Sequence, residues 1–225
     1  MHQHRVSWLV ISGLLLSAAV SSHAQNVAPN QTFDAGLAPW TQFLSTAPDP
    51  SGAGAAPTWL SAIDYTSSSS SGSAQVDINT TQPVGDAASG IAQCVNFVSA
   101  TSVSLVNYGI SVRVPTTTST DGSINATVEV QLFSGTDCTG FIGGGSQGRD
   151  LLIGVASNTT WYAIGDTGFT PPGAPVIAAS AQFRAYLREV NGVGPSTTDY
   201  KVDFDGARLV LNNTTPVRLQ AFEVD

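Results

Sequence analysis

The shortness of the apolar runs constrains this chain most. Almost every run is rich in β-branched residues and is bounded by Gly, Pro, Asn or Ser, which is typical of strands separated by turns. No amphipathic helix pattern of similar strength competes with these runs. Many short strands joined by turns predict an all-β antiparallel β-sandwich or jelly roll. The predicted strands are residues 73–78, 90–97, 104–115, 123–133, 159–170, 181–190 and 199–211.

Alternation along three of these strands separates a core face from an outward face. In residues 181–190, Phe183, Ala185 and Leu187 point toward the predicted core, and polar and aromatic side chains point away from it. The same alternation in residues 104–115 and 123–133 adds further outward polar residues. Together the outward residues predict one shared sheet face: Arg113, Glu129, Gln131, Arg184, Tyr186 and Arg188.

This face has two interpretations. It is a ligand-binding surface, or it is an ordinary solvated face on which Glu129 pairs with an arginine across strands, a contact worth about 0.2 to 1 kcal/mol. The residues alone leave both open.

Glycine, serine and proline mark three predicted loops, at residues 46–57, 66–74 and 135–150. The glycine run 143–145 lacks the Lys-Ser/Thr that follows a phosphate-binding loop, so we expect a flexible connector there. Residues 214–225 form either a last edge strand or a disordered tail.

The first 24 residues have the pattern of an export signal. Arg5 precedes an apolar run, and Ser22-His23-Ala24 forms a small-x-small site, so we expect cleavage after Ala24. We therefore expect a single domain at residues 25–213 and a secreted or periplasmic product. We expect no membrane span, because no later run reaches the roughly 20 apolar residues that a span needs.

Charge and histidine content exclude several function classes. Loss of Arg5 moves the formal charge from -8 to -9, because seven basic residues then face sixteen acidic ones, which argues against a nucleic-acid or anionic membrane partner. All three histidines lie within the first 24 residues. The mature chain therefore lacks His-dependent nucleophiles, bases and metal sites.

We expect no enzymatic activity. A glycosidase needs only a carboxylate pair, but the spacing of Glu129, Glu189 and Glu223 suggests none.

Cys94 and Cys138 are the only cysteines. In an exported chain an even pair predicts a disulfide, with two free buried thiols as the alternative. Loop-closure entropy over a 44-residue separation corresponds to about 4 kcal/mol.

Three segments carry a family resemblance. "NQTFDAGLAPW" (30–40), "TWYAIGDTGFTPPGAPVIAASAQFRAYL" (160–187) and "VDFDGARLVL" (202–211) resemble, in order and spacing, carbohydrate-binding modules of families 4, 9 and 22, which are galactose-binding-domain-like jelly rolls. The resemblance implies a sugar-binding concave sheet face with stacking aromatic rings. Its ligand-facing positions fall on Tyr186 and its neighbours Arg184 and Arg188.

The same resemblance implies a structural calcium ion held by Asn30, Asp34 and Asp205. Calcium prefers carboxylate and carbonyl oxygens and needs no His, although Gly206 replaces the family's second terminal acid. The alternative is that Asp34 caps a turn and that Asp203 and Asp205 are solvated strand residues.

The resemblance places Trp40 and Trp161 in the core. Trp59 follows a Pro-Gly loop and is a candidate stacking platform, as is Tyr65.

The leading hypothesis is a secreted noncatalytic protein that binds a polysaccharide or a surface glycan. The alternative is an envelope or extracellular-matrix protein with a structural or adhesion role and no sugar site.

Overall fold

The computed structural model describes residues 26–45, 55–68, 70–78, 88–115, 124–150, 157–189 and 200–212. The predicted export signal (1–24) and the closing segment (214–225) lie outside these residues. Within them, no helix has the length and apolarity that crossing a membrane requires.

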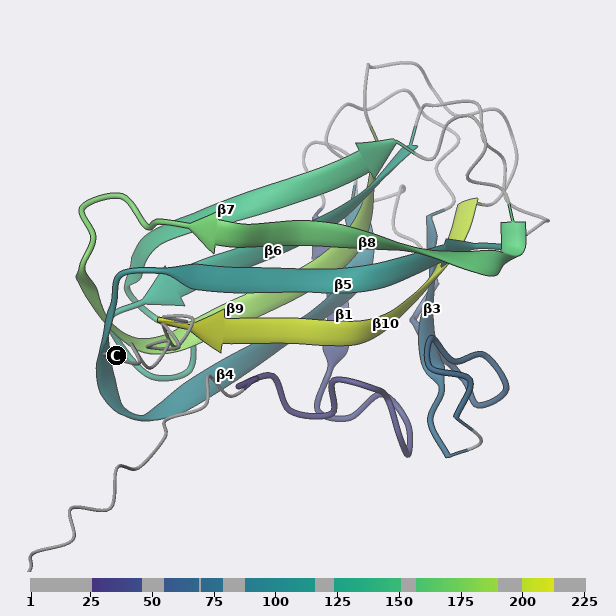
Figure 1. Ribbon diagram of the computed structural model, residues 1–225, viewed down its shortest axis with the longest axis horizontal. Helices are drawn as coiled ribbons and strands as arrows, with labels where there is room; N and C mark the ends of the chain where they lie inside the picture. Colours follow the sequence, from purple (N-terminus) through teal and green to yellow (C-terminus); the bar gives the residue numbers. More distant parts are fainter. Residues whose placement is uncertain are drawn as a thin grey trace, which may run out of the picture.

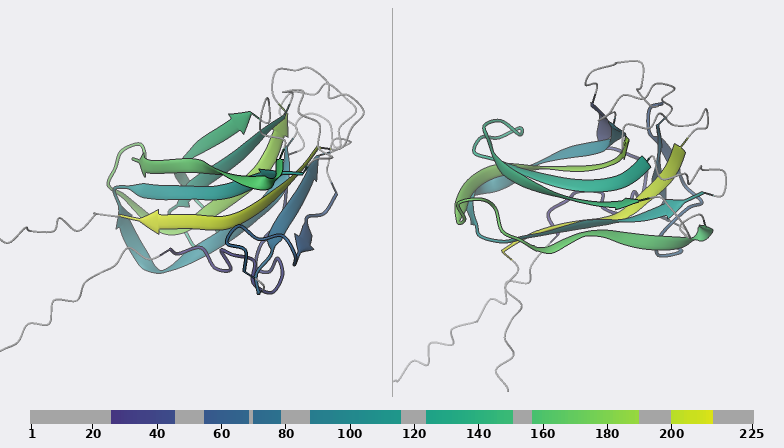
Figure 2. Two further views of the ribbon diagram at one scale, coloured as in Figure 1. Left: turned by 45° about the vertical axis from the view of Figure 1, so that its right-hand side comes forward. Right: turned by 90° about the horizontal axis from the view of Figure 1, so that it is seen from above.

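Two five-stranded sheets pack face to face. Figure 1 looks onto sheet B with sheet A behind it, and the right-hand view of Figure 2 shows the two layers from the side. Sheet A contains, in spatial order, β1 (Thr41–Ser45), β4 (Ala88–Val103), β9 (Val176–Glu189), β6 (Ile124–Phe133) and β7 (Phe141–Asp150). Sheet B contains, in spatial order, β2 (Thr58–Leu60), β3 (Ser73–Ile78), β10 (Tyr200–Leu211), β5 (Val106–Val114) and β8 (Ser157–Phe169).

The connectivity confirms the predicted fold class. Every neighbouring pair of strands is antiparallel. Most strands that are consecutive in the chain lie in different sheets, as β4, β5 and β6 show. The described chain is therefore an all-β antiparallel sandwich of the jelly-roll kind.

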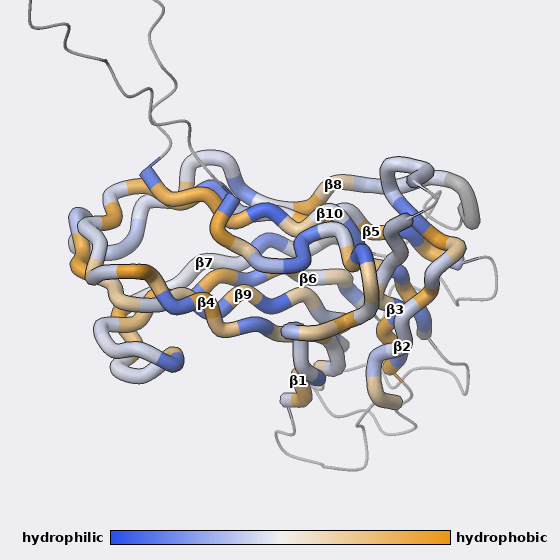
Figure 3. The backbone as a smooth tube through the Cα atoms, turned by 90° about the horizontal axis from the view of Figure 1, so that it is seen from below, coloured by the Kyte–Doolittle hydropathy of each residue, from blue (hydrophilic) through white to orange (hydrophobic). Residues whose placement is uncertain are grey.

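The core lies between the sheets and follows the predicted alternation. Phe183, Ala185 and Leu187 are fully buried on β9, as predicted. The inward rows of the other two strands are also buried: Tyr108, Ile110, Val112 and Val114 on β5, and Ala126, Val128, Val130 and Leu132 on β6. Figure 3 shows hydrophobic and hydrophilic residues alternating along several strands. Trp40 is buried as predicted, with its ring 5.6 Å from those of both Phe33 and Phe183.

The prediction of a flexible connector at the glycine run was wrong. Residues 143–145 lie inside β7, which pairs with β6 along almost its whole length. The glycines are required by close neighbours: a Cβ on Gly145 would lie 2.8 Å from the ring of Phe169, and a Cβ on Gly144 would lie 2.5 Å from the carbonyl oxygen of Val130. Tertiary packing thus overrides the low strand propensity of glycine.

The disulfide between Cys94 and Cys138 is confirmed. It fastens the β6–β7 loop to β4. Asn96 and Asp137 support the same attachment, since the Asn96 side chain both donates to the Asp137 carboxylate (2.8 Å) and accepts from its backbone N–H (2.7 Å). The loop is therefore held against one end of sheet A.

Candidate functional site

The outer face of sheet A brings together five of the six residues predicted to share a face. Antiparallel pairing places Glu129 of β6 opposite Arg184 of β9, and Gln131 opposite Gln182. Tyr186 and Arg188 continue the same row of β9, because side chains two residues apart point to the same side. We call this surface the sheet A face; its predicted members are Glu129, Gln131, Arg184, Tyr186 and Arg188.

Glu129 is the centre of a hydrogen-bond network on this face. Its carboxylate accepts from the Tyr186 hydroxyl at 3.3 Å, from Nη1 of Arg184 at 3.5 Å and from Nε2 of Gln131 at 2.7 Å. Arg184 also donates from Nε to Gln182 at 2.7 Å. Such connected charge-assisted bonds hold side chains in fixed positions. The cross-strand Glu–Arg pair of the solvated-face interpretation is therefore present, but it is part of a larger network.

Two further residues complete the face, and sequence reasoning missed both. Phe43 lies on β1, with the Arg184 guanidinium 4.7 Å above its ring and the Tyr186 ring 5.1 Å away. Gly90 pairs with Tyr186, and a Cβ there would lie 2.4 Å from the Tyr186 Cβ. Glycine at this position thus allows Tyr186 to lie close against β4.

A pocket of about 280 Å³ opens on the sheet A face. Both arginines, Glu129, Tyr186 and Phe43 contribute to its lining, with Ser45 and Ala88 at one side. Tyr186 is 8% exposed, whereas Arg188 is exposed and Arg184 and Glu129 are half-buried. The pocket therefore combines guanidinium donors and a carboxylate acceptor with aromatic walls. This combination suits a ligand that carries many hydroxyl groups.

Tyr186 shows how strongly the site restricts its side chains. Burial, together with the charge of Glu129 and the hydrogen bond to it, raises the pKa of its phenol to about 12, against a lowering effect of Arg188 and Arg184. The hydroxyl is therefore a permanent donor at neutral pH.

Arg113 does not belong to this face, and its prediction was wrong. It lies on β5, which is in sheet B. There it donates from Nε and Nη2 to the buried carboxylate of Asp203 at 2.9 and 2.6 Å, and Gln75 donates to the other oxygen of Asp203. Alternation predicts the face of a strand but not the sheet to which the strand belongs.

The two remaining tryptophans were only partly anticipated. Trp161 was expected in the core but lies half-buried on β8, 5.6 Å below the Arg113 guanidinium and 6.0 Å from the Tyr65 ring. Trp59 is 37% exposed on β2, and its indole donates to the Phe33 carbonyl at 2.9 Å. Trp59 is therefore in sheet B and is not part of the sheet A face.

The residues proposed as calcium ligands lie before β1 and on β10. Both polar groups of the Asn30 side chain are engaged: its amide donates to the carbonyls of Gly36 and Ala38, and its oxygen accepts from the Asp34 N–H. Its carbonyl accepts from Trp40 at 3.1 Å. Asn30 thus stabilises a turn.

Asp205 has a different environment. It is 1% exposed, and its two oxygens accept from the backbone N–H groups of Tyr65 and Gly206. Burial is the main cause that raises the pKa of Asp205 to about 7; the charges of Asp64 and Asp34 act in the same direction, and the two backbone hydrogen bonds act against it. In the described part of the chain no group of three or more acidic, His or Cys side chains is placed to hold a metal. The three predicted residues therefore fit calcium only in part, through Asp34 and Asp205.

Comparisons with known proteins address the fold. No family model and no curated protein matches the chain. Among solved structures, a carbohydrate-binding module of the β-sandwich superfamily matches with a TM-score of 0.48 at 7% identity, over 83% of this chain and 61% of that one. The enzymatically active domain of tailspike protein 4 from bacteriophage CBA120 matches with a TM-score of 0.47 at 15% identity, over 83% and 21%.

The C-terminal family 22 module of Clostridium thermocellum xylanase 10B matches with a TM-score of 0.42 at 13% identity, over 82% of this chain and 93% of that one. The chain spans less than two thirds of the first two proteins. Modules of families 22 and 4 are among the matches, which agrees with the resemblance seen in the sequence. At these scores the matches describe a similar arrangement of strands, and they do not assign a function.

Proposed function

We propose that this chain is a noncatalytic carbohydrate-binding protein whose ligand lies on the sheet A face. One observation carries the proposal: Glu129, Arg184, Tyr186 and Arg188, predicted from sequence as ligand-facing, converge around one pocket. Nothing in the sequence pattern required strands β6 and β9 to be neighbours, yet the pairing places Glu129 directly opposite Arg184.

The chemistry of the pocket supports sugar hydroxyls as the ligand groups. A sugar hydroxyl both donates and accepts, so a surface that offers guanidinium donors beside a carboxylate acceptor satisfies both functions. Because the Glu129 network already fixes Arg184 and Tyr186, a ligand does not have to order these side chains, which reduces the entropic cost of binding.

Binding without catalysis is the simplest reading of the acidic residues on this face. Glycoside hydrolysis normally needs two carboxyl groups flanking the scissile bond. Among the described side chains that line the pocket, Glu129 is the single carboxylate, and it is engaged by three donors. Incubation of the protein with a bound glycan, followed by chromatography of the products, tests this part; release of shorter sugars would contradict it.

Export is part of the proposal and is supported by the disulfide, since disulfides persist in oxidising compartments. Mass spectrometry of the chain from the periplasm or the medium is expected to find Gln25 as the first residue. An intact N-terminus on the exported protein would contradict cleavage after Ala24.

Structural calcium remains a prediction, with Asp34 and Asp205 as the residues that would hold the ion. A calcium ion would offset the unfavourable burial of the Asp205 carboxylate. Thermal unfolding at pH 8 is expected to occur at higher temperature in calcium than in EDTA, with no difference in Asp34→Asn. Equal midpoints in calcium and EDTA would remove the ion from the proposal.

Affinity electrophoresis tests the proposal as a whole. The purified protein is run through gels that contain glucans, xylans or bacterial surface glycans, beside Tyr186→Ala and Arg188→Ala. We expect retardation by at least one glycan and loss of retardation in both variants. Tyr162→Ala on sheet B serves as a control of the same type and is expected to bind normally.

A second candidate is the structural or adhesion role without a sugar site. One observation favours it: Tyr186 is 8% exposed and the Phe43 ring carries the Arg184 guanidinium, so little bare aromatic surface is left for stacking. Absence of retardation by every glycan would favour this role over carbohydrate binding.

A further inference from the structure

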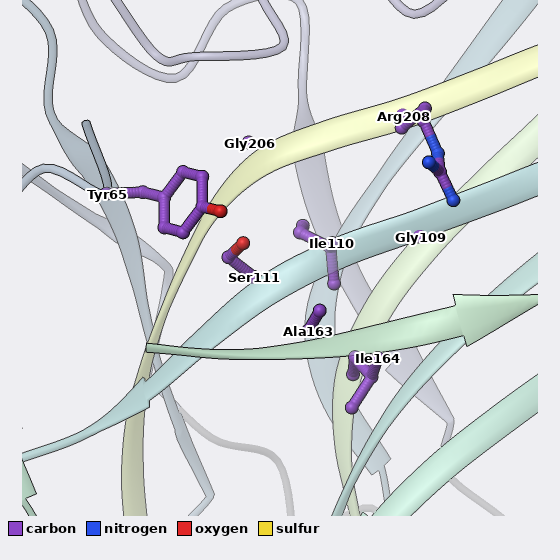
Figure 4. Close-up of a pocket in the computed structure, with 8 residues that line it drawn as sticks. All are labelled: Tyr65, Gly109, Ile110, Ser111, Ala163, Ile164, Gly206 and Arg208. Carbon is purple, nitrogen blue, oxygen red and sulfur yellow. The ribbon is translucent and has the colours of Figure 1, made fainter. Parts of the chain in front are cut away.

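A second hollow lies on the outer face of sheet B, on the opposite side of the sandwich from the sheet A face. It has a volume of about 190 Å³ and is formed between β5, β8, β10 and Tyr65, which precedes β3. Figure 4 shows the residues around it. None of them was predicted as a binding residue except Tyr65.

The floor of the hollow consists of small residues on two paired strands. Gly109 and Ser111 of β5 lie opposite Gly165 and Ala163 of β8. Larger side chains are excluded at the two glycines by backbone: a Cβ on Gly109 would lie 2.9 Å from the Ile164 carbonyl oxygen, and one on Gly165 would lie 2.2 Å from that of Tyr108. The floor is thus kept flat by the packing of the sheet itself.

Tyr65 and Arg208 form the two sides of the hollow. The Tyr65 ring borders Gly206: a Cβ added to Gly206 would lie 3.3 Å from Cδ1 of Tyr65. The Arg208 guanidinium lies above Gly109: a Cβ added to Gly109 would lie 3.8 Å from Nη2 of Arg208. Gly109 and Ser111 are two residues apart on one strand, which corresponds to about 7 Å along the floor. The volume of about 190 Å³ leaves room for a small group such as one sugar ring.

Three polar groups around the hollow have no side-chain partner among the described residues. The Tyr65 hydroxyl, the Ser111 hydroxyl and the Arg208 guanidinium make no side-chain hydrogen bond or ion pair within the described part of the chain. In Figure 4 the Tyr65 hydroxyl is directed toward Ser111, and the Arg208 side chain extends over the strand that carries Gly109. Convergent polar groups without protein partners at a concave surface are typical of a ligand site.

Tyr65 is held in position and yet exposed. Its backbone N–H donates to Asp205 at 2.7 Å, and its ring contacts Trp161 edge to face at 6.0 Å. Trp161 in turn lies under Arg113, which is fixed by Asp203. Nevertheless 49% of Tyr65 is exposed. A supported aromatic ring with an open face is the surface on which a pyranose ring packs.

The charges around Tyr65 indicate the class of ligand. The carboxylate of Asp64 is carried by the residue that directly precedes Tyr65. Arg208 is the one charged residue among the described residues that line the hollow. An anionic sugar held by Arg208 would lie near the Asp64 carboxylate, so a neutral sugar is favoured.

From these observations we infer that the hollow between Tyr65 and Arg208 is a second saccharide site, which takes one neutral pyranose residue. The ring packs on Tyr65, Arg208 and Ser111 bind its hydroxyl groups, and Gly109 and Ala163 leave room for it. The inference does not depend on the proposed function of the sheet A face.

NMR spectroscopy of the purified, isotope-labelled exported chain tests this site. The probes are the methyl glycosides of glucose, galactose, mannose, xylose and N-acetylglucosamine, with sodium glucuronate as the anionic counterpart. At least one neutral glycoside is expected to shift the amide signals of Gly109, Ser111, Ala163 and Gly206 in a saturable manner. Loss of a hydrogen bond from a charged group is expected to raise the dissociation constant about tenfold or more in Arg208→Ala.

Ala163→Leu provides the sharpest variant, because Ala163 is exposed and the larger side chain fills the hollow without touching the core. It should abolish the shifts while leaving the far-UV circular dichroism and the unfolding midpoint unchanged. Arg188→Ala on sheet A should leave the shifts unchanged, which separates this site from the first. The inference is overturned if no neutral glycoside shifts these signals, if glucuronate alone does, or if the shifts persist in Ala163→Leu.

Discussion

The hydrogen bond between Tyr186 and Glu129 permits a quantitative test of the sheet A network. In Glu129→Ala the Tyr186 hydroxyl loses its acceptor. Tyr186 is buried, with 8% of the residue exposed. A buried donor without a partner costs about 1 to 3 kcal/mol. The ion pair with Arg184 is lost as well. The side chains of Arg184 and Glu129 are 21% and 19% exposed, and this loss adds about 0.2 to 1 kcal/mol. The free energy of unfolding should therefore fall by about 1 to 4 kcal/mol.

Tyr186→Phe removes only the donor and should cost about 0.5 to 1.5 kcal/mol. In the Tyr186→Phe background Glu129→Ala leaves no tyrosine hydroxyl without an acceptor, so it should cost about 1 kcal/mol less than in the wild type. Urea unfolding of the four proteins, followed by fluorescence and circular dichroism to check two-state behaviour, measures this coupling.

The matched control is the same cycle with Tyr162→Phe, since Tyr162 lies on β8 in the other sheet. Its coupling to Glu129→Ala should stay within about 0.5 kcal/mol of zero. Equal couplings for Tyr186 and Tyr162 would show that the network does not organise the sheet A face.

Four further outcomes follow from the same structure. In Glu129→Ala the pKa of Tyr186 should fall from about 12 toward 10, as followed by the ring carbon shifts of that tyrosine; a pKa unchanged by the substitution would contradict the contact. The pKa of Tyr186 in the folded state lies above the unfolded value of about 10. The stability that protonated Tyr186 contributes is therefore complete below pH 10 and is lost as the pH rises through about 12. The difference in free energy of unfolding between the wild type and Tyr186→Phe should shrink over that interval. Gly90→Ala should lower the free energy of unfolding by about 1 to 3 kcal/mol or more, since its Cβ would meet the Ala185 carbonyl oxygen at 2.2 Å; wild-type stability on thermal unfolding would refute the close approach. Cys138→Ser should cost about 4 kcal/mol by loop-closure entropy over 44 residues, and a urea midpoint equal to that of the wild type would contradict a bridge that limits the unfolded chain.

The sequence predicts the faces of strands well and their neighbours poorly. Burial of Phe183, Ala185 and Leu187 follows directly from alternation, because one face of each strand must be covered. Arg113 follows the same rule and points outward, but on sheet B. Pairing between strands far apart in the chain depends on tertiary packing, which local periodicity does not encode.

Short or unusual strands were missed for a related reason. The strands β1 and β2 have five and three residues, too few for a periodic pattern to stand out. Phe43 was therefore overlooked although it contributes to the pocket. From the sequence alone, the glycines of β7 indicate a loop. Only the neighbouring Phe169 and Val130 in the structure explain why the strand needs glycine there.

The sequence was more informative about which residues share the sheet A face. The family resemblance and alternation both selected the row Arg184, Tyr186 and Arg188, alternation also selected Glu129, and the structure shows that Glu129 bonds to Arg184 and Tyr186. Whether this face binds a ligand stays a prediction. Apart from Tyr65, neither approach pointed to the residues of the hollow on sheet B, because its floor is made of small residues that have no chemical signature in sequence.

A chemical-shift map with a retarding glycan tests the central claim most directly. The labelled protein is titrated with an oligosaccharide of that glycan, and the perturbed amides are assigned. We expect them to cluster on the sheet A face, around Phe43, Gly90, Glu129, Arg184 and Tyr186, and to return to their free positions in Arg184→Ala. A glycan that binds without perturbing β6 and β9, or binding that is unchanged in Arg184→Ala, would contradict the account.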